Sequence, residues 1–235
     1  MLRVNQLAGF GARRGTITPG LIVFGHGASN SSSPLNTFNQ AGVSFGSEAA
    51  SRQMLMLVYG GNANVVSDGN FTTSAAIGGV AATRIFEPAA PAASHFTAWM
   101  TARQDAGGPS GATGAISATR STGNGYNTVA LALFALYDLA DPSLAAFDMV
   151  QAAANPVSLP LDVPARGIVA AMAQAGNTAA HTWTGAIEQF DATGGPGGSQ
   201  RFSAAMASGL GAQAGYTLTC GNGVTGVFGL ALSFQ

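Results

Sequence analysis

Short β-prone segments separated by glycine recur along this chain and restrict the folds open to it. The stretch Ile77-Gly78-Gly79-Val80 places apolar residues on both sides of a Gly-Gly pair. Glycine adopts the positive φ angles of a two-residue hairpin turn, so this stretch predicts strand, tight turn, strand. Roughly ten or more such segments, without alternating helix patterns, indicate an all-β protein. The sequence therefore predicts a β-sandwich.

Continuous apolar runs predict the strands at the centre of this sandwich. Gln53–Tyr59 ends at a Gly-Gly pair and is typical of a strand covered on both faces. Val129–Tyr137 suits either a buried helix or a buried strand, and its setting among strands favours the strand. Phe96–Met100 alternates as a half-buried strand does. Val157–Val163 also alternates, and we expect it on a sheet edge because Pro160 lacks a backbone donor.

The remaining segments complete the series. Asp141-Pro142 could cap and open a helix toward Ala154, which is the strongest helical candidate. Turns or loops are expected at Asn30–Pro34, Asn62–Asn70, Asp105–Gly114 and Gly194–Gly198. Further strands are expected at Leu21–Phe24, Val43–Phe45, Ile168–Ala173, Thr182–Phe190, Arg201–Ala207, Tyr216–Thr219 and Val224–Phe234.

The composition limits domain number and partners. A chain of 235 residues that is 47% hydrophobic can bury one full core, so we expect a single β-sandwich domain over residues 21–235 after a short extended arm at 1–20. Only 8% of the residues are charged and the net charge is −1, which argues against nucleic-acid binding. All nine basic residues are arginines, so mechanisms that need a lysine are excluded. A nearly neutral surface favours packing against copies of the chain or a larger assembly.

The single cysteine and the apolar runs bear on the compartment. Cys220 allows no internal disulfide and is expected to be buried, which fits assembly in a reducing cytoplasm. The N-terminal residues lack an apolar stretch of signal-peptide length, and no run approaches the ~20 residues of a spanning helix. We therefore expect neither secretion nor membrane insertion.

The N-terminal segment differs from the rest in polarity. Arg3, Arg13 and Arg14 precede the first acidic residue, Glu48. One interpretation is a frayed terminus. The other is a docking arm in which Leu7 and Phe10 are apolar anchors and Arg13 and Arg14 contact carboxylates of a partner.

One motif resembles a catalytic site. Gly42-Val43-Ser44-Phe45-Gly46 matches the nucleophile-elbow pattern, with Asp105 and His181 in a permissible order downstream. An elbow needs a strand before the serine and a helix after it, whereas here a polar loop precedes and the following segment is too short for a clear helix. A serine hydrolase that uses Ser44 is thus the enzyme alternative, and we assign no catalytic residue.

Metal and cofactor signals are weak. His26, His95 and His181 are scattered, and Asp138, Asp141 and Asp148 lack the spacing of a calcium loop. The glycine-rich stretches miss the spacing of a dinucleotide fingerprint. We therefore predict no metal and no cofactor.

Aromatic residues provide a different binding hypothesis. Trp99, Trp183 and Tyr126 could stack on sugar rings, although aromatic residues in strands are more often part of a core. A module that binds a host receptor or a glycan is therefore an alternative function.

Five segments together resemble a family of tailed-bacteriophage virion proteins, common in phages and prophages of Alphaproteobacteria. The segments, spread over most of the chain, are Leu7-Ala8-Gly9-Phe10-Gly11; Ala50-Ser51-Arg52 before the run at Gln53; Ile77-Gly78-Gly79-Val80-Ala81-Ala82-Thr83; Leu161-Asp162-Val163-Pro164 before Gly167-Ile168-Val169; and Thr182-Trp183-Thr184-Gly185 before Glu188.

The resemblance implies a structural role in the virion. It implies a jelly-roll-like sandwich displayed on the particle and an N-terminal arm that ties it to capsid or tail proteins. We expect a non-enzymatic head decoration, head fibre or tail accessory subunit, assembled in the host cytoplasm as a homo-oligomer. The stretch at 141–155 departs from the family pattern, which leaves its conformation open.

Overall fold

The computed structural model describes residues 17–18, 22–25, 37–61, 72–88, 94–120, 128–195 and 198–235. These residues form antiparallel strands and a short 3₁₀ segment, η1 (Gln104–Ala106), and no α-helix occurs among them. The all-β prediction is confirmed. The jelly-roll-like connectivity and the division into a 1–20 arm and one 21–235 domain stay predictions.

The described strands form four sheets. Sheet I contains, in spatial order, β3 (Thr37–Ser44), β9 (Thr113–Arg120), β5 (Thr72–Ile77) and β6 (Val80–Ala81). Sheet II contains β1 (Ile17–Thr18) and β2 (Ile22–Gly25) beside β10 (Thr128–Leu136), then β4 (Gln53–Gly61), β8 (Ser94–Met100) and β7 (Thr83–Phe86). Sheet III contains β11 (Asp148–Ala154), β18 (Val227–Phe234), β13 (Gly167–Ala175), β16 (Gln200–Leu210) and β15 (Ile187–Gly194). Sheet IV contains β12 (Val157–Val163), β17 (Gln213–Gly221) and β14 (Thr182–Thr184).

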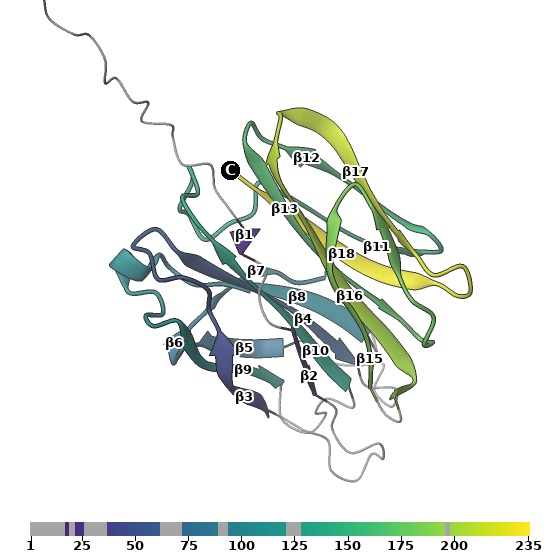
Figure 1. Ribbon diagram of the computed structural model, residues 1–235, viewed down its shortest axis with the longest axis horizontal. Helices are drawn as coiled ribbons and strands as arrows, with labels where there is room; N and C mark the ends of the chain where they lie inside the picture. The colour runs from purple at the N-terminus through teal and green to yellow at the C-terminus, as the bar shows by residue number, and fades with distance from the viewer. Residues whose placement is uncertain are drawn as a thin grey trace, which may run out of the picture.

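The four sheets are stacked in the order I, II, III, IV, so that the body has two inner and two outer layers (Figure 1). One apolar cluster lies between sheets I and II and includes Phe45, Met56 and Trp99. A second fills the space between sheets II and III, and a third lies between sheets III and IV. Sheets I and II come from the N-terminal part of the chain and sheets III and IV from the C-terminal part.

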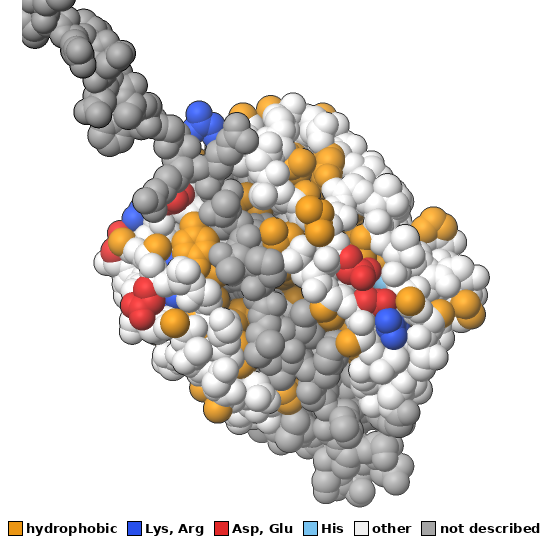
Figure 2. All heavy atoms as spheres, in the orientation of Figure 1, with side chains coloured by type: hydrophobic (Ala, Val, Ile, Leu, Met, Phe, Trp, Pro, Cys, Tyr) orange, Lys and Arg blue, Asp and Glu red, His pale blue; other side chains and the backbone are white. Residues whose placement is uncertain are grey.

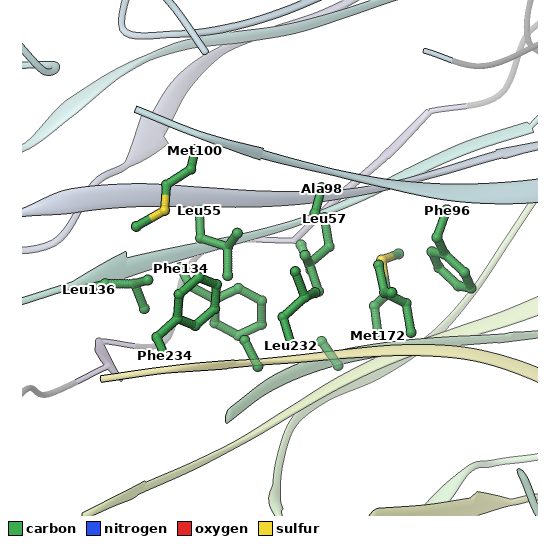
Figure 3. Packing of buried hydrophobic residues seen from close by; sticks show 14 of the residues in the cluster. Leu55, Leu57, Phe96, Ala98, Met100, Phe134, Leu136, Met172, Leu232 and Phe234 are labelled. Atoms are coloured by element: carbon green, nitrogen blue, oxygen red, sulfur yellow. The ribbon is translucent and has the colours of Figure 1, made fainter. Parts of the chain in front are cut away.

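Strand β4 shows why the inner sheets have continuous apolar sequences. Successive side chains of a strand point to opposite faces. Leu55 and Leu57 therefore pack toward sheet III, while Met54 and Met56 pack toward sheet I. Every residue of β4, β10 and β13 is buried, so both faces of these strands need apolar side chains. Figure 3 shows the cluster between the inner sheets, where Leu57 and Phe96 approach Met172.

Several local predictions are confirmed. Gly78 and Gly79 have φ of 61° and 78°, and Ile77 pairs with Val80 across this two-residue turn. Gln53–Tyr59 and Val129–Tyr137 lie in the fully buried strands β4 and β10, apart from the terminal Tyr137. Pro160 lies exposed on β12, an edge strand of sheet IV, as its missing donor requires.

Three local predictions are wrong. Phe96–Met100 is buried on both faces, because β8 belongs to an inner sheet with a partner sheet on each side. The helix from Asp141 toward Ala154 does not form, since β11 pairs along its whole length with β18. The single strand at Thr182–Phe190 is two strands in different sheets, because Gly185 turns the chain with a φ of 84°.

Other expected segments lie wholly or partly outside the described residues. Among them are the polar loops at Asn30–Pro34 and Asn62–Asn70. The glycine-rich turn at Gly194–Gly198 is described at its ends, where the N–H of Gly198 donates to the carbonyl of Gly195 at 3.0 Å.

Candidate functional site

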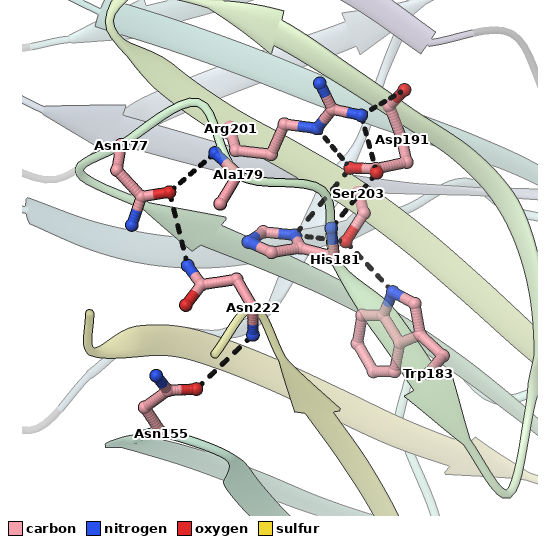
Figure 4. A network of polar contacts seen from close by, with 9 residues as sticks. All are labelled: Asn155, Asn177, Ala179, His181, Trp183, Asp191, Arg201, Ser203 and Asn222. Carbon is pink, nitrogen blue, oxygen red and sulfur yellow. Dashed lines mark hydrogen bonds and ion pairs between the residues drawn. The ribbon is translucent and has the colours of Figure 1, made fainter. Parts of the chain in front are cut away.

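A buried polar network joins sheets III and IV and is the chemically richest cluster among the described residues (Figure 4). His181 precedes β14, Asp191 lies on β15, and Arg201 and Ser203 lie on β16. Pairing of β15 with β16 sets Asp191 opposite Ser203. Strand pairing therefore brings together residues that are 10 to 22 positions apart in sequence.

A carboxylate anchors the network. Asp191 accepts from Arg201 at both of its oxygens, with Nε at 2.7 Å from Oδ1 and Nη2 at 2.6 Å from Oδ2. Oδ2 also accepts the backbone N–H of His181 at 3.1 Å. Two-pronged pairing of this kind fixes direction as well as distance. The carboxylate thus holds the segment before β14 against β16.

A serine hydroxyl occupies the centre of the network. Ser203 Oγ lies 2.7 Å from Nδ1 of His181 and accepts the indole N–H of Trp183 at 2.9 Å. The side chain of His181 is 0% exposed, and Ser203 is 0% exposed as well. Nε2 of His181 has no hydrogen-bond partner among the described residues.

Burial sets the protonation of these groups. It lowers the pKa of His181 to about 4; the carboxylate of Asp191 opposes this shift and the Arg201 guanidinium adds to it. Burial also raises the pKa of the nearby Cys220 thiol to about 12. At neutral pH the imidazole is therefore uncharged and the thiol is protonated.

The geometry differs from that of a serine-hydrolase triad. A triad places the serine and the carboxylate on opposite ring nitrogens of the histidine. Here Ser203 lies on Nδ1, and the nearest carboxylate oxygen of Asp191 is 4.0 Å from that same nitrogen. Both side chains of the Ser203–His181 pair are fully buried, and their contact links β16 of sheet III to the residue before β14 of sheet IV.

A fully buried arginine, Arg52, joins loops at the opposite side of the body. Arg52 immediately precedes β4 and is 0% exposed. Its Nη1 donates to the carbonyl oxygens of residues 45, 46 and 47, and its Nη2 donates to those of Pro109 and Gly111. One guanidinium therefore satisfies carbonyl groups from two loops that are more than fifty residues apart in the chain.

The structure separates the three residues of the hydrolase hypothesis. Ser44 ends β3 in sheet I and is exposed. His181 lies beside sheet IV, with sheets II and III between these two outer layers. Asp105 is exposed in η1 and forms an ion pair with Arg103 at 2.7 Å. No reacting group can contact all three at once.

The tryptophans of the glycan hypothesis are buried. Trp99 is 4% exposed and lies in the cluster between sheets I and II, and Trp183 is 9% exposed and lies in the cluster between sheets III and IV. Little of either ring is exposed, and the guanidinium carbon of Arg84 lies 5.7 Å from the centre of the Trp99 ring, so neither tryptophan offers a free stacking surface. Tyr126 lies outside the described residues.

The docking-arm residues Leu7, Phe10, Arg13 and Arg14 also lie outside the described residues, as does His26. His95 is buried on β8. Across the described ranges, no group of three or more histidine, cysteine, aspartate or glutamate side chains is placed to hold a metal ion.

Sequence reasoning noticed His181 but missed Asp191, Arg201 and Ser203, its partners. These residues carry no local motif, because they meet only through pairing between strands. In the sequence, Arg52 is part of the segment Ala50-Ser51-Arg52, and nothing in that segment identifies it as a buried cation. A lone arginine directly before a continuous apolar strand is the one signal that could have indicated its burial.

In the part of the chain that the structure describes, no helix has the length and apolar character needed to cross a membrane. Comparison with known proteins identifies no relative: no family model, no curated protein and no solved structure matches the chain.

Proposed function

We propose that this chain is a non-enzymatic structural protein of a tailed-bacteriophage particle. Its role is that of a head decoration, head fibre or tail accessory subunit, attached through Leu7, Phe10, Arg13 and Arg14 and assembled with copies of itself. Capsid or tail proteins are its partners, and it is assembled in the host cytoplasm.

The observation that carries the proposal is a body of four stacked sheets with few free charges. Among the described arginines, Arg52 and Arg120 are buried, Arg84, Arg103 and Arg201 form ion pairs with carboxylates, and Arg166 is exposed. Figure 2 shows a face on which the few charged side chains lie in small groups among neutral and hydrophobic ones. Such a surface packs against other protein surfaces with little cost of desolvating charge.

The polar groups of the interior support a structural role. The imidazole of His181 is neutral and fully buried, and the Cys220 thiol is protonated and buried. Both terminal nitrogens of Arg52 donate to loop carbonyl groups. These groups stabilise the sheet stack and are not accessible to a substrate.

Purified particles test the proposal. An antibody against the described body should label particles at a regular position in electron micrographs. A chain that lacks residues 1–15 should keep the strand-rich circular dichroism of the full chain but fail to enter particles. A control that carries Arg103→Gln, a half-buried residue at the surface of the body, should be incorporated normally.

Two results would contradict the proposal. Absence of the full-length protein from purified particles would remove the virion role. Normal incorporation of the chain without residues 1–15 would remove the arm as the point of attachment.

A further inference from the structure

The strand pairing of the N-terminal part of the body is repeated in the C-terminal part. The first unit contains β2, β3, β4, β5, β7, β8, β9 and β10, and the second unit contains β11 to β18. The two-residue strands β1 and β6 of the N-terminal part have no counterpart in the second unit. We count the strands of each unit from first to eighth in chain order. In both units the eighth strand pairs with the first and the third, the sixth pairs with the third and the fifth, and the seventh pairs with the second and the fourth. All these pairs are antiparallel in both units.

The residue register is repeated as well. In the first unit, Ala98 on β8 pairs with Leu57 on β4, which pairs in turn with Ala132 on β10. The same three positions of the second unit are Ala204 on β16, Met172 on β13 and Leu230 on β18. The sixth strand then carries the same pattern in both units, Phe-x-Ala-x-Met, at residues 96–100 and 202–206.

A strand irregularity falls at the same place in both units. Phe86 on β7 pairs with Ala98, and the register of this pair of strands shifts between Arg84 and Phe86. Phe190 on β15 pairs with Ala204, and the register shifts between Glu188 and Phe190. A bulge inserts one residue at a defined point, so its repetition at equivalent positions is an independent correspondence.

A tryptophan hydrogen bond is repeated next to this pattern. Thr97 and Ser203 each lie between the phenylalanine and the alanine of the sixth strand. Thr97 Oγ1 accepts the indole N–H of Trp99 at 2.9 Å, and Ser203 Oγ accepts that of Trp183 at 2.9 Å. The two tryptophans come from different strands, so the position of the acceptor is kept while its donor differs.

The repeated pattern faces the boundary between the units. Phe96, Ala98 and Met100 pack into the cluster between sheets II and III, as do Phe202 and Ala204 of the second unit. Equivalent faces of two equivalent units are therefore buried against each other. Contact through the same face is the arrangement found in two-fold symmetric dimers.

The strand pairing, the register, the bulge and the tryptophan hydrogen bond are all repeated. We therefore infer that the chain is a tandem fusion of two copies of one eight-stranded unit. The contact between sheets II and III is a subunit-type interface, and the partner that fits each face is a second copy of the same unit. Each unit has its own core, between sheets I and II or between sheets III and IV.

Two adjacent alanines on β16 provide a matched pair of variants. Ala204 faces the cluster between the units, whereas Ala205 faces the cluster within the second unit. Ala98 occupies the position equivalent to Ala204 in the first unit. The test introduces Ala98→Glu, Ala204→Glu or Ala205→Glu into the full chain, together with a protease site between Ser143 and Leu144 in the segment that joins the units.

After cleavage, the two fragments of the otherwise unsubstituted chain should elute together in gel filtration and separate on dilution. Cleaved Ala98→Glu and Ala204→Glu should each release two separate fragments whose amides remain protected from hydrogen exchange. Cleaved Ala205→Glu should lose amide protection in the second unit alone.

Unfolding of both fragments of the unsubstituted chain on separation would overturn the inference. Loss of amide protection in all four sheets of the cleaved Ala98→Glu variant would also overturn the inference, because it would show that the four sheets unfold as one cooperative unit.

Discussion

Nη2 of Arg52 lies 2.8 Å from the carbonyl oxygen of Pro109, and this hydrogen bond joins the start of β4 to the loop that precedes β9. The same guanidinium holds the carbonyl groups of the loop between β3 and β4. Buried carbonyl groups that lose their donor keep the cost of desolvation without a compensating bond.

Replacement of this cation should therefore destabilise the protein. We expect Arg52→Met to lower the free energy of unfolding by about 2–4 kcal/mol, measured by urea unfolding. Arg103→Met is the control: Arg103 pairs with Asp105 at the surface, and its loss should change stability by less than about 0.5 kcal/mol. Equal stability of the two variants would show that the carbonyl cluster does not need the guanidinium.

The free energy of unfolding should decrease as the pH is lowered below neutrality, because of His181. Its pKa is lowered from 6.5 to about 4 in the folded protein, mainly by burial. Below pH 6.5 the unfolded chain binds a proton at His181 that the folded chain does not. The contribution of the neutral His181 to the free energy of unfolding is therefore complete above pH 6.5 and is lost as the pH falls toward 4. The loss should reach about 3 kcal/mol at most.

Urea unfolding at roughly pH 7.5, 5.5 and 4.5 measures this effect. His181→Gln keeps a polar side chain that does not titrate, so its stability should depend less on pH over the same range. The same pH dependence in both proteins would assign the effect to other groups.

The two glycines of the β5–β6 hairpin should respond differently to alanine. Both have positive φ, but a Cβ on Gly78 would lie 2.8 Å from Cβ of Pro109 and 3.0 Å from a ring carbon of Phe45, whereas one on Gly79 would meet nothing within 4 Å. Gly79→Ala should cost about 1 kcal/mol for the left-handed backbone alone. Gly78→Ala should cost at least about 1 kcal/mol more, because it adds a steric clash. Thermal or urea unfolding of the two variants checks this order, and a more stable Gly78→Ala would refute it.

The cysteine should be unreactive in the folded protein. Cys220 is 0% exposed, and burial raises its pKa to about 12. Because the thiolate is the reactive form, a thiol reagent such as DTNB should label it only after unfolding. Labelling rates in increasing urea should therefore follow the unfolding transition, and rapid labelling without urea would contradict the burial of the thiol.

The sequence predicted strands well where the pattern is local. The Gly-Gly turn at Gly78 and the buried run at Gln53–Tyr59 follow from backbone preferences and hydrophobicity within a few residues. The segment at Asp148–Ala154 shows the limit of such signals: a helical start at Asp141 is plausible locally, but pairing with β18 decides in favour of a strand. The Asp141 side chain does accept a hydrogen bond, from the N–H of Ser143 at 2.9 Å, within a turn that no helix follows.

The polar network was less predictable. His181 was visible as one of three histidines, yet nothing near it in sequence points to Ser203 or Arg201. These residues meet because β15 and β16 pair and the segment before β14 folds over them. Their role follows from burial, which a sequence pattern does not show for polar side chains.

By itself, the sequence determined that the chain forms strands and roughly where they begin and end, because turn-forming glycines and alternating or continuous apolar runs act over a few residues. The tertiary structure alone decided which sheet each strand joins, why Phe96–Met100 is buried on both faces, and how two similar units pack face to face. The physical reason is that strand hydrogen bonds and face-to-face burial are made with partners distant in the chain, and these long-range contacts override local preference.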